Sequence, residues 1–297
     1  MNIVILSRSF SLYSTQSLYN AAVKRGHLVR IIDYMMCDLF IKNGVFKVFH
    51  LGEELNSADA IIPRIGVNVT DYGSLVIRHF EQMNIFSTMS SESLIRTRNK
   101  FGSMQLLASN GIPVPDTAIS WNYDTLEEFV NNFGTHPAVI KLLSSTHGEG
   151  VIKSENAKMS TTLMEAFLKL NHDVLIQNFI TESSGIDIRA FVVGNKLVAA
   201  MERIAQSGEF RSNIHRGAMS RPVRLTKEEI RIAKESTRIM GLKVAGVDIM
   251  RSRKGPVVIE VNASPGLEGI ETTTRVNVAK SIITYIENKK KDAYDGD

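Results

Sequence analysis

Short apolar runs alternate with amphipathic stretches over the first ninety residues. The expected strands are residues 3–6, 28–32 and 58–62, and the expected helices are residues 14–25 and 70–83. Gly26 ends the first helix and Pro63 stops the third strand, while Thr70 and Asp71 are capping candidates for the second helix. This alternation predicts an open βαβ layer.

The turn after the first apolar run lacks the glycine fingerprint of dinucleotide-binding domains. Ser7, Arg8 and Ser9 stand where GxGxxG would be needed. The sequence therefore argues against a Rossmann dehydrogenase, and we expect this layer to bind a ligand other than a dinucleotide or to take part in assembly.

A basic helical segment with Gly111, Pro113 and Pro115 at its end separates this layer from the rest of the chain. Beyond it, the pattern predicts a strand from Thr117, a helix at 124–132, strands at 138–142 and 174–177, and a helix at 157–170. The remainder predicts a hairpin of 188–193 and 197–204, a helix at 227–240, two strands and a last helix at 276–287. We therefore divide the chain into 1–95, 96–182 and 183–297, of α/β plus α+β class.

Composition narrows the class of protein. With 43% apolar residues among 297, the chain can bury a sizeable core, and a single cysteine, Cys37, builds neither an internal disulfide nor a zinc cluster. No signal-peptide core follows Met1 and no apolar run reaches the length of a membrane span, so we expect a cytoplasmic protein with no membrane partner. The basic run 289–291 precedes three aspartates, which favours a solvated tail over a nucleic-acid surface.

Acidic residues inside apolar strands mark a candidate metal site. If the hairpin over 247–266 is centred near Lys254, Asp248 lies opposite Glu260, and Asn262 projects from the same face. Two carboxylates and an amide are hard oxygen ligands that suit Mg²⁺ or Mn²⁺ bridged to nucleotide phosphates. An exposed strand face is the alternative.

Two lysines and a glycine turn are candidates for phosphate binding. Lys141 is centred in an apolar strand before a loop that contains Gly148 and Gly150, where backbone N–H groups can approach phosphate oxygens. Lys100 begins a helix and is a second candidate cation. The loop matches neither a Walker A motif nor a kinase glycine loop, and an ordinary hairpin turn with a snorkelling lysine is the alternative.

The segment 210–217 is dense in hydrogen-bond donors. Arg211, Asn213, His215 and Arg216 fall within six residues, and Arg203 precedes them on the expected hairpin. Guanidinium groups match carboxylate and phosphate oxygens, whereas we give the lone histidine no catalytic role. No nucleophile of the Ser/His/Asp or Cys/His kind stands in recognisable context.

Taken in order, these residues resemble the ATP-grasp superfamily. The segments ILSR, RGH, PRIG, SMQLLA, FRSN, HRG and EVNASPGLEGIE are similar to those of RimK-type alpha-L-glutamate ligases over almost the whole chain. The resemblance implies an ATP-grasp fold: a pre-ATP-grasp domain (1–95), a central subdomain (96–182) and a C-terminal subdomain with the metal site (183–297), the last two clamping ATP.

The resemblance also implies roles for individual residues. Lys100, Lys141, Gly148 and Gly150 would hold phosphates, Gln177, Asn178 and Phe179 the adenine, and Asp187 the ribose hydroxyls. Arg211, Ser212 and Asn213 would contact phosphate or the acyl group, with Arg211 and Arg203 as catalytic residues. Asp248, Glu260 and Asn262 would bind two magnesium or manganese ions. Asn178 stands where the family usually has glutamate, and the loop STHGEG lacks a further glycine.

The implied reaction makes an amide bond at the cost of ATP. A carboxylate attacks the γ-phosphorus, ADP leaves, and an amine displaces phosphate from the acyl phosphate. Our leading hypothesis is that L-glutamate is added to the C-terminal tail of a small-subunit ribosomal protein. A small-molecule or carrier-protein ligase and a non-catalytic nucleotide-sensing, ribosome-binding module are the alternatives. Arg64 and Arg78 are conceivable carboxylate contacts or ordinary surface residues, and the resemblance implies a homo-oligomer, a tetramer.

Overall fold

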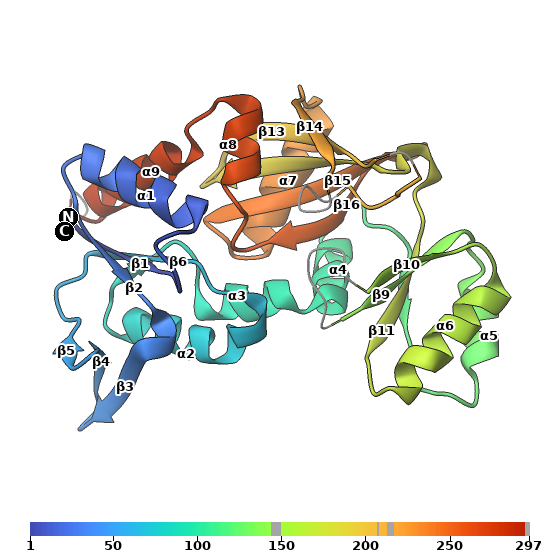
Figure 1. The fold of residues 1–297 in the computed structure, drawn as a ribbon, viewed down its shortest axis with the longest axis horizontal. Coiled ribbons are helices and arrows are strands. Elements are labelled where there is room, and N and C mark those ends of the chain that lie inside the picture. Colours follow the sequence, from blue (N-terminus) through green and yellow to red (C-terminus); the bar gives the residue numbers. More distant parts are fainter. Residues whose placement is uncertain (144–149, 207, 213–216, 295–297) are drawn as a thin grey trace.

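The computed structural model describes residues 1–143, 150–206, 208–212 and 217–294. Within these ranges the strands form four sheets, and the chain is elongated, with the first and last parts at one end and the middle part at the other (Figure 1). No helix in the described ranges is both long and apolar enough to cross a bilayer.

A parallel sheet in the order β2-β1-β6-β7 forms the core of the first part. Its elements are β1 (Asn2–Leu6), α1 (Tyr13–Lys24), β2 (Leu28–Ile32), β6 (Ala60–Pro63), α2 (Thr70–Gln82) and β7 (Phe86–Ser87). The predicted βαβ layer is confirmed, and Gly26, with φ +81°, ends α1 as expected. The capping prediction is wrong: α2 starts after Val69 without a side-chain cap, and the Thr70 hydroxyl donates backwards to the Val67 carbonyl.

A second, antiparallel sheet in the first part was not predicted. It consists of β3 (Cys37–Lys42), β4 (Val45–His50) and β5 (Glu53–Glu54), and it extends from the body of the protein as a ribbon (Figure 1). Phe40 and Ile41 are exposed on it, so its pattern lacks the alternation of a half-buried strand.

Two short helices, α3 (Ser91–Arg98) and α4 (Lys100–Ser109), link the first part to the middle part. Asn99 separates them, because its side chain accepts from the Gly102 N–H and caps α4. The middle part is an antiparallel sheet in the order β10-β9-β11-β8 with two helices on one side. Its elements are β8 (Thr117–Ile119), α5 (Leu126–Phe133), β9 (Ala138–Leu142), β10 (Val151–Ser154), α6 (Ala157–Lys169) and β11 (Val174–Asn178).

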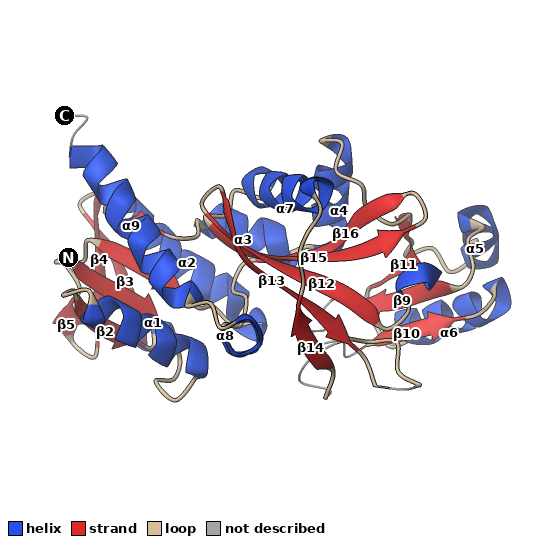
Figure 2. Ribbon diagram, turned by 90° about the horizontal axis from the view of Figure 1, so that it is seen from above, coloured by secondary structure: helices blue, strands red, loops and turns tan. Residues whose placement is uncertain are grey.

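The last part is built on a five-stranded antiparallel sheet in the order β14-β13-β12-β15-β16 (Figure 2). Its elements are β12 (Ile186–Val193), β13 (Lys196–Ile204), β14 (Met219–Pro222), α7 (Lys227–Ile239), β15 (Val244–Ser252), β16 (Gly255–Asn262), α8 (Glu268–Thr274) and α9 (Val278–Tyr294). The predicted hairpin of β12 and β13 and the helix α7 are confirmed, and α9 continues beyond its expected end.

The hydrophobic core does not follow the order of the chain. One buried cluster joins Phe80 of α2 to Val247 of β15, and another joins Leu18 of α1 to Ile282 of α9. Only the cluster of the middle part, with Ile140 and Met164, is confined to that part. The first and last parts therefore share apolar cores, and the middle part has its own.

Candidate functional site: an acidic strand pair facing two lysines

The two acidic residues expected to bind metal lie directly opposite each other. Asp248 on β15 pairs with Glu260 on β16, and Gly246 pairs with Asn262. The turn is centred half a residue before Lys254, because Ser252 pairs with Gly255, and a bulge after Asp248 restores the expected register. The Asn262 amide nitrogen lies 3.4 Å from Asp248 Oδ2, so all three side chains share one face.

Asp248 is buried between two arginines. Arg189 donates from Nε and Nη2 to its two oxygens at 2.8 and 2.7 Å, and Arg203 Nη2 lies 3.0 Å from Oδ2. Burial raises the pKa of Asp248, but the two guanidinium charges outweigh it and hold the pKa below its ordinary value. Sequence reasoning missed Arg189, although its place two residues after Asp187 on one strand puts both on the same face.

Arg203 connects Asp248 to Asp187. It donates to both oxygens of Asp187 at 2.6 and 2.7 Å, and the Ser212 hydroxyl donates to Oδ2 at 2.6 Å. Burial raises the pKa of Asp187, because Arg203 offsets it only in part and the Asp248 charge adds to it. The catalytic role of Arg203 and the ribose contact of Asp187 stay predictions, but the structure joins these residues in one buried charge network.

The two predicted phosphate lysines approach this acidic face from different elements. Lys100, the first residue of α4, donates to the carbonyls of Leu142 and Leu143 at 2.7 and 3.0 Å. Burial lowers its pKa to about 8, with Glu260 opposing the shift and Lys141 adding to it.

Lys141 lies on β9 and donates to Gln177 Oε1 at 2.5 Å, while Gln177 donates to the Thr117 hydroxyl at 2.8 Å. Burial lowers the pKa of Lys141, and the charges of Glu260 and Asp248 oppose the shift. The two lysines and the acidic pair thus lie within electrostatic reach of one another.

The residues expected to hold adenine lie at the end of β11. The N–H groups of Asn178 and Phe179 already donate to the carbonyls of Asp116 and Pro137, at 2.8 and 3.2 Å. Since each backbone amide has one donor, only carbonyls and side chains of these two residues are left for a base. The Phe179 ring lies between Lys153, 4.7 Å from its centre, and Phe210, in an edge contact at 5.9 Å.

The donor-rich segment after β13 is described only in part. Arg211 forms an ion pair with Glu209 at 2.6 Å, and Ser212 is bound to Asp187. The predicted contacts Asn213 and Gly148 lie outside the described residues. Gly150 has φ +64°, and a Cβ there would lie 2.4 Å from Leu142 Cδ1, so any other residue would strain the backbone and force the Leu142 side chain to move.

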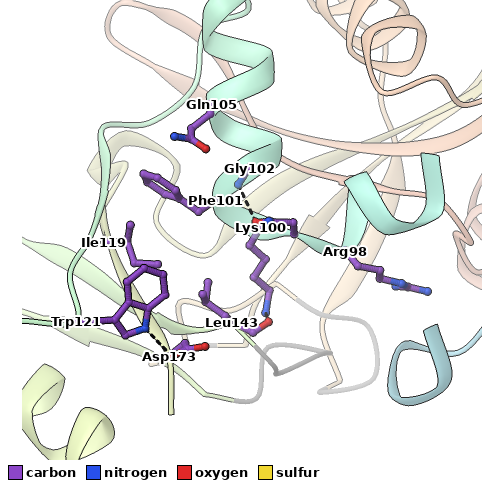
Figure 3. A pocket seen from close by; sticks show the side chains of 10 residues that line it. Arg98, Lys100, Phe101, Gly102, Gln105, Ile119, Trp121, Leu143 and Asp173 are labelled. Atoms are coloured by element: carbon purple, nitrogen blue, oxygen red, sulfur yellow. Dashed lines mark hydrogen bonds between the residues drawn. The ribbon is translucent and has the colours of Figure 1, made fainter. Parts of the chain in front are cut away.

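A cavity of about 340 Å³ lies beside the first turn of α4 (Figure 3). Lys100, Phe101, Ile119 and Trp121 line it, and Trp121 donates to Asp173 at 2.6 Å. Of the expected ATP-binding residues it contains only Lys100, so this cavity adjoins the candidate site rather than enclosing it.

The donor set suits a divalent cation that also binds phosphate. Within the described ranges no cluster of three His, Cys, Asp or Glu side chains forms, and the acidic face offers two carboxylates and one amide. Glu260 is exposed and makes no ion pair with any described residue, whereas Asp248 is held by arginines. Glu260 and Asn262 would therefore hold such an ion directly, with Asp248 behind them.

Two family models together match nearly the whole sequence. The RimK pre-ATP-grasp domain matches residues 1–94, and the RimK-like ATP-grasp domain matches residues 97–286. The chain belongs to the RimK family of ATP-grasp proteins. The predicted fold and family are thereby confirmed.

Two curated relatives of this RimK-family chain have the same name. A probable alpha-L-glutamate ligase of Syntrophotalea carbinolica is 50% identical over 98% of this chain and 97% of its own length, and one of Vibrio atlanticus is 48% identical over the same shares. The prediction of an ATP-dependent, ADP-forming ligase is confirmed.

Solved structures show the same fold at low sequence identity. The ATP-grasp ligase PsnB, complexed with minimal precursor, Mg and ADP, has a TM-score of 0.76 at 17% identity, covering 98% of both chains. The macrocyclase MdnC of Microcystis aeruginosa, bound with a precursor peptide, has a TM-score of 0.75 at 15% identity, covering 97% of this chain and all of its own.

Proposed function

We propose that this RimK-family ligase joins the amino group of L-glutamate to the C-terminal carboxylate of a protein tail, through an acyl phosphate. The name shared by relatives near 50% identity supports glutamate as the amine. Peptide complexes of the ATP-grasp ligases PsnB and MdnC support a peptide acceptor, and our specific hypothesis is the tail of a small-subunit ribosomal protein.

The observation that carries this proposal is the charge pattern around β15 and β16. Glu260 is an exposed carboxylate whose charge reaches Lys100 and Lys141, and it stands opposite a buried carboxylate. A nucleotide triphosphate with its cation fits between an acidic face and two ammonium groups, because the lysines pair with phosphate oxygens and the acids with the cation.

Each residue then has a defined task. Lys100 and Lys141 bind and orient phosphate oxygens, and Arg211 neutralises the transferred group. Glu260 and Asn262 would hold Mg²⁺ or Mn²⁺ directly, with Asp248 behind them, and the bound ion would supply charge neutralisation for the phosphate groups. Arg203 and Arg189 position the acidic strand pair, because both guanidinium groups bind the Asp248 carboxylate.

The reaction needs no covalent enzyme intermediate. The acceptor carboxylate attacks the γ-phosphorus and ADP leaves; the glutamate amine, after losing a proton, attacks the acyl carbon and phosphate leaves. The contribution of the chain is positioning and charge stabilisation, consistent with the absence of a nucleophile motif in the sequence.

The proposal is tested by ADP release with ATP, Mg²⁺ and each of the twenty amino acids, with and without a synthetic peptide copying a ribosomal-protein tail. We expect release that requires both glutamate and peptide, a peptide product heavier by glutamyl residues, and release slowed about 10²–10³-fold by Glu260→Ala. Glu128→Ala, an exposed acid on α5, is the matched control. Release with another amino acid, or with glutamate and no peptide, would replace the proposal with a small-molecule ligase.

A further inference from the structure

Arg64 stands at the carboxyl end of β6, on the junction between the first and last parts of the chain. Its Nη2 donates to the carbonyl of Pro265 at 2.8 Å and lies 3.4 Å from that of Ser264. Among the described residues no carboxylate comes within ion-pair distance of it. Burial lowers the pKa of Arg64 to about 10, and the charge of Arg98 adds to the shift.

Arg98 ends α3 and faces the same junction. Its Nη2 donates to the carbonyl of Ile65, the residue after Arg64, at 2.8 Å. Its Nε is buried without a hydrogen-bond partner in the described ranges, as is the hydroxyl of Ser264. Arg98 also lines the cavity beside α4, and Figure 3 shows its side chain extending away from Lys100.

Two neighbouring guanidinium groups without a carboxylate partner are an unusual arrangement. Each is partly removed from water and repels the other, and a buried polar atom without a partner costs about 1–3 kcal/mol. The carbonyls of Ile65, Ser264 and Pro265 engage only one nitrogen of each group. The Nε–H and Nη1–H donors remain, and such guanidinium donors bind carboxylate oxygens through charge-assisted hydrogen bonds.

The position of Arg64 and Arg98 at the end of the parallel sheet also favours a ligand site. β1 leads through α1 to β2 on one side, while β6 lies on the other side of β1, so the strand order reverses between β1 and β6. In open parallel sheets ligands bind at the carboxyl ends of the strands at such a reversal. Arg64 lies at this point, and its N–H donates to the carbonyl of Leu6, the last residue of β1.

The pair also adjoins the reacting groups. Arg98 precedes Lys100 by two residues, and Ser264 follows Asn262 by two. The charge of Glu260 reaches both Arg98 and Lys100. A substrate group held by the two arginines would therefore lie next to the phosphate and cation positions rather than at a remote surface.

We propose that Arg64 and Arg98 form a binding site for a carboxylate of a ligation substrate that does not itself react. The inference rests on the proposed function. L-glutamate brings two such carboxylates when its amine reacts, and an acidic acceptor tail brings side-chain carboxylates. The arginines are specificity-determining residues in this assignment, since an uncharged analogue leaves their charge unpaired.

The test compares Arg98→Gln and Arg64→Gln with wild type, using Arg231→Gln as the control for loss of an arginine engaged in ion pairs. KM is measured separately for L-glutamate, acceptor peptide and ATP. We expect a rise of about tenfold or more in the KM of one carboxylate substrate, given the usual strength of charged hydrogen bonds. We expect the KM of ATP to change less than twofold.

The substrate affected identifies the source of the carboxylate. If it is glutamate, testing glutamine as amine separates the two carboxylates: a smaller preference for glutamate over glutamine in Arg98→Gln assigns the side-chain carboxylate, and an unchanged preference assigns the α-carboxylate. Arg64→Lys keeps the positive charge and should recover part of the affinity that Arg64→Gln loses. If Arg64 had only a structural role at the junction, restoring the charge would not restore affinity.

Unchanged KM values for both carboxylate substrates, or a rise confined to ATP, would overturn the inference while leaving the proposed function intact. If wild type turns over no glutamate, the proposed function fails instead. In that case, calorimetric titration of glutamate and peptide into wild type and Arg98→Gln, with ADP and Mg²⁺ present, tests the carboxylate site independently of turnover. If Arg98→Gln binds glutamate and peptide as tightly as wild type does, the inference is overturned as well.

Discussion

Asp248 and Glu260 face each other across β15 and β16, yet only Asp248 is buried and ion-paired. The two paired acids therefore have different roles. The buried one is fixed within the sheet, and the exposed one is left for a ligand.

Replacing Glu260 should remove activity without harming the fold. We expect Glu260→Ala to lower kcat by about 10²–10³-fold, a loss typical of one group that stabilises transition-state charge. The free energy of unfolding should change by less than about 0.5 kcal/mol, because the side chain is exposed. Chemical denaturation alongside ADP release measures both. A large loss of stability would contradict the division of tasks.

Replacing Asp248, in contrast to replacing Glu260, should lower the stability of the fold. Asp248→Asn leaves Arg189 and Arg203 without their carboxylate, and breaking a buried ion pair costs about 3–5 kcal/mol. We expect a lower denaturation midpoint than for Glu260→Ala under the same conditions. A midpoint equal to wild type would show that the arginines do not depend on Asp248.

Lys100 should make ATP binding sensitive to alkaline pH. Its pKa is lowered to about 8, so the free enzyme loses this charge as pH rises through that value. The KM of ATP should then rise by up to about tenfold per pH unit, the limit for one proton. In the Lys100→Arg variant the KM of ATP should depend less on pH, because arginine stays charged. A pH dependence as steep as that of wild type would show that another group causes it.

The same pKa shift affects stability with a defined sign. The folded chain releases the Lys100 proton near pH 8 and the unfolded chain near 10.5, so between these values the unfolded state binds more protons. The free energy of unfolding therefore rises with pH across this window through this group. The rise should be smaller in Lys100→Met.

Lys141 should contribute to nucleotide affinity at little structural cost. Lys141→Met removes a buried charge and its bond to Gln177. We expect the KM of ATP to rise about tenfold or more, while stability changes by about 1 kcal/mol or less, because the removed desolvation penalty offsets the lost hydrogen bond. The exposed Lys158→Met on α6 is the control. An unchanged KM would exclude Lys141 from the nucleotide site.

Gly246 should tolerate no side chain. A Cβ there would lie 2.8 Å from Pro265 Cβ, and the ring cannot move without the loop that follows Asn262. We expect Gly246→Ala to destabilise the fold by about 1–3 kcal/mol, the usual cost of overpacking. Gly266→Ala, which meets nothing within 4 Å, is the matched control.

Local sequence pattern predicted the strands and helices that have a regular apolar period. It also placed Asp248 opposite Glu260, since the spacing of acids around one tight turn fixes the register. The ribbon of β3 to β5 was missed because its outward residues Phe40 and Ile41 are apolar, which removes the alternation on which strand prediction depends.

Partners distant in sequence were harder to predict. Arg189 was missed because its partner Asp248 comes fifty-nine positions later, and only the β12–β15 register unites them. Gln177 was expected beside adenine, but it accepts a hydrogen bond from Lys141. Arg211 was expected on a phosphate or the acyl group, but it forms an ion pair with Glu209. Their contacts with ligand stay predictions.

The two bonds from Lys100 to the carbonyls of Leu142 and Leu143 join α4 to a sheet whose apolar core is separate from the rest. A phosphate that draws the ammonium away must take the place of those carbonyls. Nucleotide affinity and the docking of the middle part are thus linked through one side chain. A substitution that loosens this docking would change how tightly ATP is bound without contacting ATP.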